Sequence, residues 1–364
     1  MNDAFLARLR ELCGIDSPTH DLAGVDACAL LLARWCERAG LAVELVGTPS
    51  GLSVIARLER PGAGRTLLVG HHDTVFPSGT AAARPVRVEG GRALGPGVAD
   101  MKGGVLVGLA ALERLAGGGQ PCGTVELHSV PDEEGRDVAP FTLDRWSADA
   151  CLTLECGRAS GAIVSARKAG GWITLEAEGR AAHSGTSWRE GRSALRALAI
   201  EALRIEREVH EARPEMTCVV TELHAGVGKN TVPPSGTATV DVRAQSREDM
   251  LWAVSRIKDF GSHDGVTLRA SDDPGFPPLT RTPWLVDAAL AALGRHGAAA
   301  LEEQAGGVSD GSWASYRGIP TVDGLGPIGD EDHTEREWID LASVEPRVAA
   351  VADLCLAIGS PEPA

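Results

Sequence analysis

Two adjacent carboxylates follow a hydrophobic segment near the middle of the chain. Glu133 and Glu134 stand in the sequence Ser129-Val130-Pro131-Asp132-Glu133-Glu134-Gly135. One carboxylate of such a pair could bind a metal ion while its neighbour moves a proton. Taken alone the pair is weak evidence, because acidic pairs in turns are usually solvated surface. Residues elsewhere in the sequence decide between these two interpretations.

Sequence context favours two of the ten histidines, His71 and His333, as metal ligands. In the segment 70–75, residues i and i+2 of an extended chain point the same way, so we expect His71 and Asp73 on one face. His71 would be a ligand, and Asp73 would be the carboxylate that orients it. His72 points the other way and is predicted to be structural.

Two further carboxylates stand at the ends of predicted elements. Asp100 ends the sequence Gly95-Pro96-Gly97-Val98-Ala99-Asp100, where a loop enters a helix. A helix N-cap is the usual role of an aspartate there, so that alternative stays open. Glu155 closes the apolar run 152–154, where a solvated strand end is the alternative.

Together these positions supply two imidazoles and three carboxylates, from His71, Asp100, Glu134, Glu155 and His333. Such a donor set suits two Zn²⁺ ions, or Mn²⁺ or Co²⁺. One carboxylate must then bridge the ions, and Asp100 is the natural candidate. Glu133 would be free to deprotonate a metal-bound water, which is the chemistry of amide hydrolysis.

The elements that must position these residues alternate between helix and strand. Apolar β-branched runs predict strands at 53–58, 66–69, 124–130 and 151–154, and periodicity predicts helices at 25–39 and 102–115. This alternation predicts an α/β domain with a mostly parallel sheet. In such a domain the candidate ligands would gather at the carboxyl ends of the strands.

The pattern changes after residue 171. It predicts a strand at 172–178, a helix at 193–209, strands at 217–224 and 236–243, a helix at 248–260 and a strand at 266–270. The order β-α-β-β-α-β is the ferredoxin-like arrangement. A Pro-rich linker at 273–278 follows, and then helical patterns at 284–293 and 341–358. We therefore predict a discontinuous catalytic domain, residues 1–168 and 275–364, interrupted by an inserted domain, residues 169–274.

Composition excludes several classes of protein. With 364 residues, 43% hydrophobic and 23% charged, the chain is of ordinary globular type, and its net charge of -15 argues against a nucleic-acid partner. No signal peptide and no uninterrupted apolar run of membrane-spanning length is evident, which predicts a cytoplasmic protein with no membrane partner. Eight scattered cysteines without a C-x-x-C pair predict buried, reduced thiols.

With these residues assembled, the chain resembles the M20 family of metallopeptidases, the group of glutamate carboxypeptidase, acetylornithine deacetylase and succinyl-diaminopimelate desuccinylase. The matching segments are 70–75, 95–104, 132–135, 154–155, 179–185 and 333–338. Several such motifs in the family's order are a specific signal, and they cover nearly the whole chain. The resemblance implies a zinc-exopeptidase-like α/β catalytic domain and an inserted ferredoxin-like lid that commonly dimerises.

The resemblance also implies how the ligands are shared. His71 and Glu155 would bind one ion, Glu134 and His333 the other, and Asp100 would lie between them. Glu133 matches the general base and Asp73 the residue that orients His71. The peptide bond after Asp100 is often cis in this family.

Four residues outside the metal ligands match the family's substrate-binding positions. His183 would reach the active site of the other subunit of a dimer and stabilise the oxyanion. Asn230 and Arg243 would hold the free carboxylate of the substrate, and Ser309 would line the substrate pocket. On the sequence alone, an exposed surface position is the alternative for His183 and for Arg243.

The resemblance thus implies a homodimeric, dinuclear metal-dependent amide hydrolase of the carboxypeptidase type. It would cleave small peptides or N-acyl amino acids next to a free carboxylate. An N-acyl amino acid deacylase, like acetylornithine deacetylase, or a dipeptidase is the alternative, and a non-catalytic binding protein of the same fold is favoured least. The acidic run 330–332 before His333 departs from the family pattern, and such a rim would disfavour anionic substrate groups or favour cationic ones.

Overall fold

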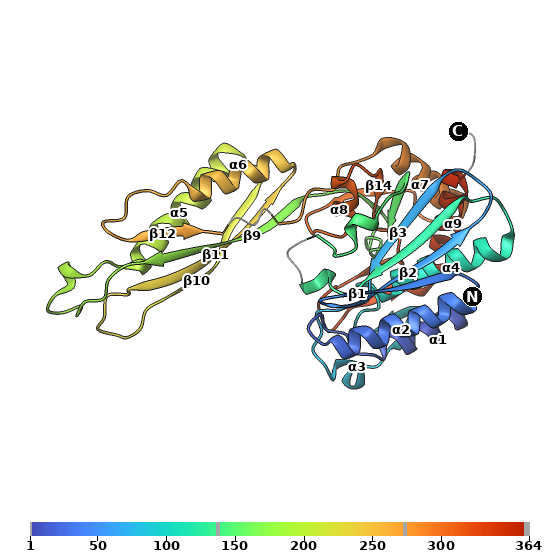
Figure 1. Cartoon of the computed structure of the whole chain (residues 1–364), viewed down its shortest axis with the longest axis horizontal. Coiled ribbons are helices and arrows are strands. Elements are labelled where there is room, and N and C mark those ends of the chain that lie inside the picture. The colour runs from blue at the N-terminus through green and yellow to red at the C-terminus, as the bar shows by residue number, and fades with distance from the viewer. Residues whose placement is uncertain (1, 136–138, 272–274, 360–364) are drawn as a thin grey trace. The chain divides into compact units, whose positions relative to one another are not determined.

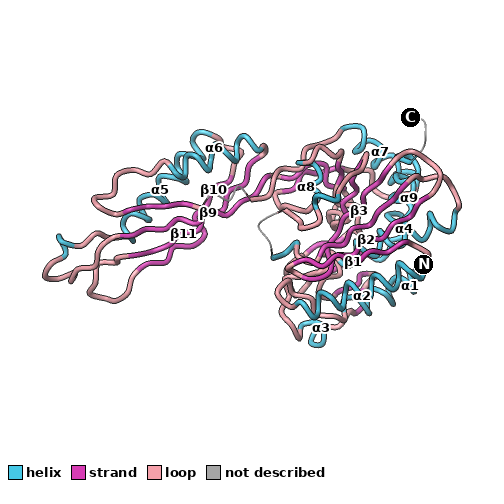
Figure 2. The backbone as a smooth tube through the Cα atoms, viewed as in Figure 1, coloured by secondary structure: helices cyan, strands magenta, loops and turns pink. Residues whose placement is uncertain are grey.

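The computed structural model describes residues 2–135, 139–271 and 275–359 (Figures 1 and 2). The chain divides into two compact units. Unit 1 comprises Met1–Arg167, Leu279–Ala305 and Ser309–Ala364, and unit 2 comprises Lys168–Pro278 and Gly306–Val308. The predicted end of the inserted domain at residue 274, together with part of the Pro-rich linker, falls in 272–274 and lies outside the described residues.

The central sheet of unit 1 has six strands in the order β1-β2-β6-β3-β7-β14. These are β1 (Ala42–Thr48), β2 (Gly51–Glu59), β3 (Arg65–His71), β6 (Thr124–Val130), β7 (Ala150–Thr153) and β14 (Thr321–Val322). Strands β6, β3, β7 and β14 are parallel to one another, whereas β2 runs antiparallel to both of its neighbours. The prediction of an α/β fold with a mostly parallel sheet is therefore confirmed.

Helices cover both faces of this sheet. One face packs into a large hydrophobic core with α1 (Asn2–Cys13), α2 (Leu22–Arg38), α4 (Lys102–Gly118), α7 (Pro283–Arg295) and α9 (Val344–Gly359). Alternate residues of β3 point to opposite faces, so Leu68 joins this core while Leu67 and Val69 pack on the other side near α8 (Gly311–Tyr316). A short helix, α3 (Thr80–Ala83), follows β3 in the chain. All eight cysteines are free and buried, which confirms that prediction.

Short strands that the sequence did not predict join distant segments of unit 1. A small sheet has the order β15-β16-β5-β4, formed by β15 (Gly329–Asp330), β16 (Trp338–Asp340), β5 (Arg92–Leu94) and β4 (Arg87–Glu89). A parallel pair joins β13 (Glu302–Ala305) to β8 (Ile163–Arg167). The small sheet matters for the site, because it fixes the segment around His333 beside the one that leads to Asp100.

Unit 2 is a four-stranded antiparallel sheet with two helices on one face (Figure 1). Its elements are β9 (Ala169–Glu178), α5 (Ala194–Ala212), β10 (Thr217–Ala225), β11 (Ser235–Ala244), α6 (Arg247–Lys258) and β12 (Thr267–Ala270). The strand order is β10-β11-β9-β12, which is the ferredoxin-like arrangement. Buried residues such as Ile173, Val240 and Val242 point toward the helices, so the alternate residues of β9 and β11 face away from them.

Candidate active site

Three of the five candidate ligands follow neighbouring parallel strands. His71 ends β3, Glu134 lies in the turn directly after β6, and Glu155 lies two residues after β7. Because β3 pairs with both β6 and β7 in parallel, the carboxyl ends of all three strands meet at one edge of the sheet. Asp100 approaches this edge from the loop before α4, and His333 approaches it from the segment between β15 and β16.

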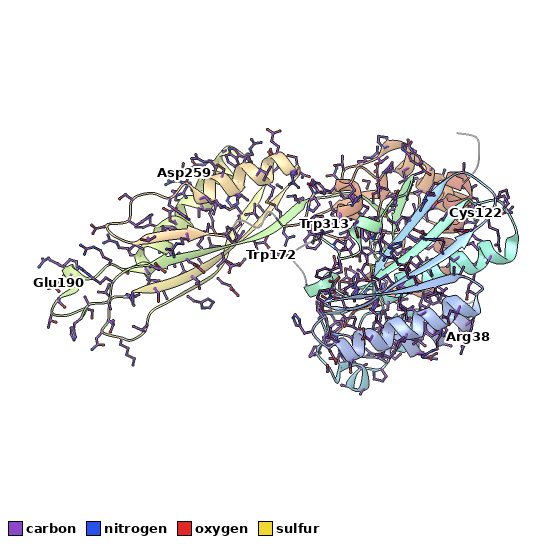
Figure 3. The ribbon with its side chains drawn as sticks, viewed as in Figure 1. Arg38, Cys122, Trp172, Glu190, Asp259 and Trp313 are labelled. Atoms are coloured by element: carbon purple, nitrogen blue, oxygen red, sulfur yellow. The ribbon has the colours of Figure 1, made fainter. Side chains whose placement is uncertain are left out.

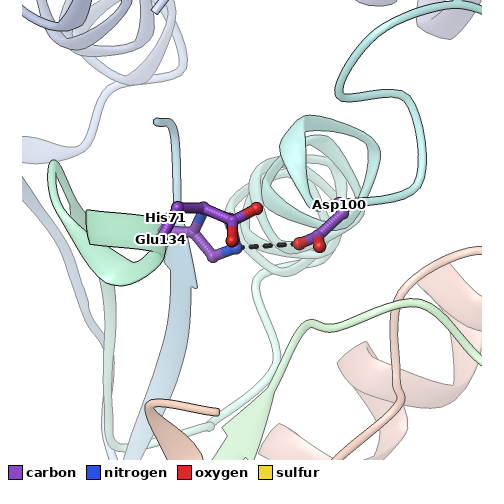
Figure 4. Close-up of side chains that lie close together, drawn as sticks. All are labelled: His71, Asp100 and Glu134. Carbon is purple, nitrogen blue, oxygen red and sulfur yellow. Dashed lines mark hydrogen bonds and ion pairs between the residues drawn. The ribbon is translucent and has the colours of Figure 1, made fainter. Parts of the chain in front are cut away.

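The five side chains form two groups that share Asp100. Nε2 of His71 lies 3.0 Å from Oδ1 of Asp100 and 3.9 Å from Oε1 of Glu155. Nε2 of His333 lies 3.0 Å from Oδ2 of Asp100 and 3.3 Å from Oε2 of Glu134. Figure 4 shows His71, Asp100 and Glu134 converging, with the contact between His71 and Asp100 dashed. Ligand atoms of these three residues lie within 4.8 Å of one another, close enough to hold a metal ion.

Asp73 connects His71 to the turn that carries the two glutamates. Its Oδ1 lies 3.2 Å from Nδ1 of His71, which leaves Nε2 of that ring to face Asp100. The same carboxylate accepts hydrogen bonds from the backbone N–H groups of Glu133 and Glu134, both at 3.1 Å. It also accepts one at 2.6 Å from Oγ1 of Thr19. Fully buried Asp73 therefore orients an imidazole and fixes the acidic turn at once.

Asp100 does not cap the helix that follows it. The N-cap of α4 is Met101, and the side chain of Asp100 instead contacts the two imidazoles. The peptide bond between Asp100 and Met101 is cis, as the resemblance implies. Gly104 lets the start of α4 approach the loop after β7, since a Cβ there would lie 1.8 Å from the carbonyl oxygen of Leu154.

Glu337 supports the loop that ends at Asp100, a role that sequence reasoning missed. Its buried carboxylate accepts backbone hydrogen bonds from Gly97 at 2.9 Å, Ala99 at 2.8 Å and Asp100 at 3.1 Å. Desolvation raises the pKa of Glu337 to about 8. No spacing rule links residue 337 to residues 97–100, so the sequence carried no signal for this contact beyond its place in the sixth motif.

The electrostatics of the five ligands favour a bound cation. Desolvation raises the pKa of Glu134 to about 7 and that of Glu155 well above its usual value. Burial alone would raise the pKa of Asp100, but hydrogen bonds from His333 and His71 hold it below its usual value. The hydrogen bond to Asp100 raises the pKa of His333 to about 11. No described residue donates a hydrogen bond to the buried Oε1 of Glu134, which leaves a carboxylate oxygen available to a metal ion.

Glu133 stands beside the ligands without joining them. Its backbone is fixed by Asp73, whereas no hydrogen bond engages its carboxylate within the described ranges. Desolvation raises the pKa of Glu133 well above its usual value. A half-buried carboxylate with a raised pKa is suited to accept and return a proton.

In unit 2 the structure brings His183 and Asn230 together but not Arg243. A bridge pairs His183 with Thr231, and the backbone carbonyl of Asn230 accepts a hydrogen bond from Ser184 at 2.9 Å. Nδ1 of the exposed His183 ring accepts from the backbone N–H of Gly185 at 3.1 Å. This places the ring proton on Nε2, the nitrogen that can donate to a ligand.

Arg243 lies toward the other end of the same sheet. It is eight residues further along β11 than Ser235, roughly 27 Å at the rise of an antiparallel strand. The pairing of β9 and β11 continues past Ser235, because the backbone N–H of Gly179 donates to Pro234 and that of Val232 donates to Ala182. His183 and Asn230 therefore lie beyond that end of β11, at least the length of the strand from Arg243 of the same chain.

Ser309 is fully buried in unit 1. Its hydroxyl donates to Oδ2 of Asp323 at 2.6 Å, and the same oxygen accepts from Nε of Arg167 at 2.6 Å. The pocket-lining role of Ser309 stays a prediction. His72 is also buried and its Nδ1 lies 2.8 Å from Oγ of Ser129, away from the ligands, as a structural role requires.

Comparisons with known proteins agree with one another. The model of peptidase family M20/M25/M40 matches residues 67–357. Carboxypeptidase G2 from Pseudomonas sp. (strain RS-16) is 28% identical over 376 residues, covering 98% of this chain and 90% of the relative. Succinyl-diaminopimelate desuccinylase from Xylella fastidiosa (strain 9a5c) is 27% identical over 365 residues, covering 92% of this chain and 93% of the relative.

The fold has a close counterpart among solved structures. A tripeptidase from Staphylococcus aureus superposes with a TM-score of 0.84 at 21% identity and covers 99% of both chains. At that identity the likeness concerns the fold alone. Among the described residues, no helix is long and apolar enough to cross a lipid bilayer.

Proposed function

The chain belongs to peptidase family M20/M25/M40 and is a metallohydrolase of that type; on that premise we propose that it is a dinuclear carboxypeptidase-type amide hydrolase. The family membership confirms the resemblance drawn from the six sequence motifs. It also sets aside the alternative of a non-catalytic binding protein. The proposed substrates are small peptides or N-acyl amino acids whose scissile amide stands next to a free carboxylate.

The observation that carries this proposal is the pair of ligand groups that share Asp100. His71 and Glu155 would hold one metal ion, and Glu134 and His333 would hold a second, with Asp100 between them. Two nitrogen and three carboxylate donors suit two Zn²⁺ ions per subunit, and Mn²⁺ or Co²⁺ fit the same donors. The buried Oε1 of Glu134, which accepts no hydrogen bond from the part of the chain that the structure describes, supports the fit.

When bound, the metal ions would polarise the scissile carbonyl and lower the pKa of the attacking water. Glu133 would take the proton from that water and deliver it to the leaving amine, so that it ends the cycle unchanged. Asp73 would keep Nε2 of His71 aimed at the metal site, because it holds Nδ1 of that ring. Glu337 would keep Asp100 in place through the backbone of the loop.

The substrate's carboxylate and the oxyanion are assigned to residues of unit 2. Arg243 and Asn230 would bind the carboxylate, and Nε2–H of His183 would donate to the oxyanion. A dipeptide spans only about 7 Å, far less than the strand that separates Arg243 from the other two residues. We therefore propose a homodimer formed through unit 2, in which His183 and Asn230 serve the active site of the other subunit.

The alternative activity is that of an N-acyl amino acid deacylase or a dipeptidase with the same machinery. Similarity to a succinyl-diaminopimelate desuccinylase favours keeping the deacylase as a second candidate. The acids at 330–332 stand directly before His333 in the chain, and they favour substrates with a cationic group near that side of the site. A cytoplasmic location and the absence of a nucleic-acid partner remain parts of the proposal.

A substrate panel tests the proposed activity. Purified protein loaded with Zn²⁺, Mn²⁺ or Co²⁺ is assayed on dipeptides and on N-acetyl, N-succinyl and N-aromatic-acyl amino acids. Turnover that a chelator abolishes and that Glu133→Gln lowers sharply is the expected result. Metal-loaded protein that cleaves no amide in the panel, or turnover indifferent to the chelator, would contradict the proposal.

A further inference from the structure

Asp241 and Arg243 lie on the face of the unit 2 sheet that points away from the helices. They are two residues apart on β11, so their side chains share one face, whereas the intervening Val242 is buried in the core. Across the ladder, Asp241 is paired with Trp172 of β9 and Arg243 with Gly170. Trp172, labelled in Figure 3, projects from β9 on this same face, since Ile173 next to it is buried.

Three contacts hold the guanidinium of Arg243. Its Nε donates to Oδ1 of Asp241 at 2.9 Å, and its Nη2 donates to Oδ2 of Asp241 at 3.1 Å. Its Cζ lies 4.9 Å from the centroid of the Trp172 ring, within range of a cation–π contact. Gly170 leaves room for the guanidinium, because a Cβ at that position would clash with Nη1.

The hydrogen bonds to Asp241 occupy only one of the two edges of the guanidinium that could bind a carboxylate. Nε and Nη2 form the side edge of the planar group, and Asp241 occupies that edge as a fork. The end edge, formed by Nη1 and the second hydrogen of Nη2, meets no acceptor among the residues that the structure describes. A second carboxylate can bind this end edge in the same bidentate manner.

An acid beside a carboxylate-binding arginine needs an explanation, because its charge opposes the substrate's charge. The pair differs from an ordinary surface ion pair in its burial. Side chains of Arg243 and Asp241 are 19% and 26% exposed, whereas those of Arg269 and Glu178, on the same sheet, are 62% and 65% exposed. Exposed pairs contribute little, but a half-buried fork fixes the orientation of the guanidinium plane.

We propose that Asp241 is a positioning residue that presents the end edge of Arg243 to the substrate's carboxylate. The inference rests on the proposed function, in which Arg243 binds that carboxylate. It adds that Asp241, with the ring of Trp172 and the bare backbone of Gly170, sets the direction from which the carboxylate is bound. Specificity for a terminal carboxylate over a neutral carboxamide then depends on Asp241 as well as on Arg243.

Matched substrates test this role. An N-acyl amino acid that the enzyme cleaves is compared with its α-carboxamide, in the wild type, Asp241→Ala, Arg243→Ala and the double variant. Glu178→Ala, which removes the exposed pair on the same sheet, is the control. We expect Asp241→Ala to lower the carboxylate-to-carboxamide ratio of kcat/KM by roughly 10-fold or more, as for the loss of hydrogen bonds to a charged group. The loss should appear in KM, with the carboxamide unaffected and no further loss when Asp241→Ala is added to Arg243→Ala.

Three kinetic outcomes would overturn the inference. The carboxylate-to-carboxamide ratio of kcat/KM in Asp241→Ala could equal that in Glu178→Ala. Asp241→Ala could instead lower kcat/KM equally for both substrates. Finally, the double variant could show the full effect of Asp241→Ala in addition to that of Arg243→Ala. A ratio unchanged in Arg243→Ala has a different meaning, because it would overturn the carboxylate-binding role of Arg243 itself and the inference with it.

A second measurement does not depend on turnover. In protein labelled with ¹⁵N-arginine, the Nε–H signal of Arg243 should be protected from solvent exchange in the wild type and in Glu178→Ala, and should lose that protection in Asp241→Ala. An unprotected signal in the wild type would overturn the fork on which the inference rests.

Discussion

Nε2 of His333 lies 3.0 Å from Oδ2 of Asp100, although 233 positions separate the two residues in the chain. This distance is that of a hydrogen bond, which requires a proton between the two atoms. In the protein alone the hydrogen bond to Asp100 raises the pKa of His333 to about 11, so a proton takes that place. Metal binding and protonation of His333 therefore exclude each other.

Metal binding should release protons and strengthen as the pH rises. With its pKa at about 11, His333 is protonated throughout the neutral range, and it must become neutral to bind a metal ion. Glu134 has a pKa of about 7, so below neutral pH metal binding must displace a second proton from its carboxyl group. Calorimetric titration of metal-free protein with Zn²⁺ in buffers of different ionisation enthalpy counts the protons. We expect at least about one proton released per pair of ions at pH 7 to 8, and an affinity that falls toward pH 6.

His333→Asn is the control for that titration. It removes the imidazole whose proton is displaced, so the number of released protons should fall by about one. Binding of two ions to the wild type with no net proton release would contradict the proposed competition.

Substitution of the neighbouring glutamates should separate chemistry from metal binding. Glu133→Gln keeps the shape of the side chain but cannot accept a proton, so kcat should fall by roughly 10² to 10⁴-fold. Its metal content should stay at the wild-type value, measured by elemental analysis after dialysis. Glu134→Gln is the matched comparison, because it removes a ligand oxygen next to His333 and should lower the metal content. Loss of metal in Glu133→Gln would refute the division of roles between the two acids.

The sequence predicted the elements that carry the ligands because these are long and strongly patterned. The strand expected at 124–130 coincides with β6, and the expected helices at 25–39 and 102–115 overlap α2 and α4. β1 was missed, since it is a half-exposed edge strand without a clear alternation of apolar residues. Strands of two or three residues, such as β15 and β5, are too short to show any period.

Four of the candidate ligands, His71, Asp100, Glu134 and Glu155, could be found in the sequence because they stand at the ends of patterned elements. His333 lies between the short strands β15 and β16, so only its motif at 333–338 indicated it. The residues that support the ligands could not be found in the same way. Thr19 and Glu337 meet Asp73 and the loop before Asp100 only through tertiary packing, across segments with no fixed spacing. The fork between Asp241 and Arg243 could be predicted from the sequence, because residues i and i+2 of a strand share a face. Its geometry could not, because it also depends on Trp172, which pairs with Asp241 across the ladder.

Glu337→Gln should weaken metal binding without touching a ligand. A glutamine offers one acceptor oxygen and would turn its NH₂ group toward one of the backbone N–H groups of residues 97–100. We expect metal affinity to fall by about 10 to 100-fold, as for other residues that orient ligands, and the free energy of unfolding of metal-free protein to fall by about 1–3 kcal/mol. Exposed Glu335→Gln is the control two residues away. Unchanged affinity in Glu337→Gln would show that the loop keeps Asp100 in place unaided.

His183 should act on the active site of the other subunit. His183→Ala should lower kcat by about 10²-fold or more, the effect of losing an oxyanion donor. In a mixed dimer of His183→Ala and Glu133→Gln subunits, one site would combine an intact Glu133 with the His183 of the other chain. Random mixing should thus restore roughly a quarter of the wild-type rate, because half of the dimers are mixed and each has one complete site.

The control replaces Glu133→Gln by the double variant His183→Ala/Glu133→Gln, which cannot supply the histidine and should restore nothing. Subunit mixing is verified by the mass of differently tagged dimers, and light scattering gives the oligomeric state. If His183 served its own chain, no mixed dimer would contain a complete site and the rate would stay low. A protein that is monomeric at assay concentrations would contradict the proposed dimer. The roughly 27 Å of β11 between Ser235 and Arg243 would then prevent His183, Asn230 and Arg243 from binding the same substrate molecule.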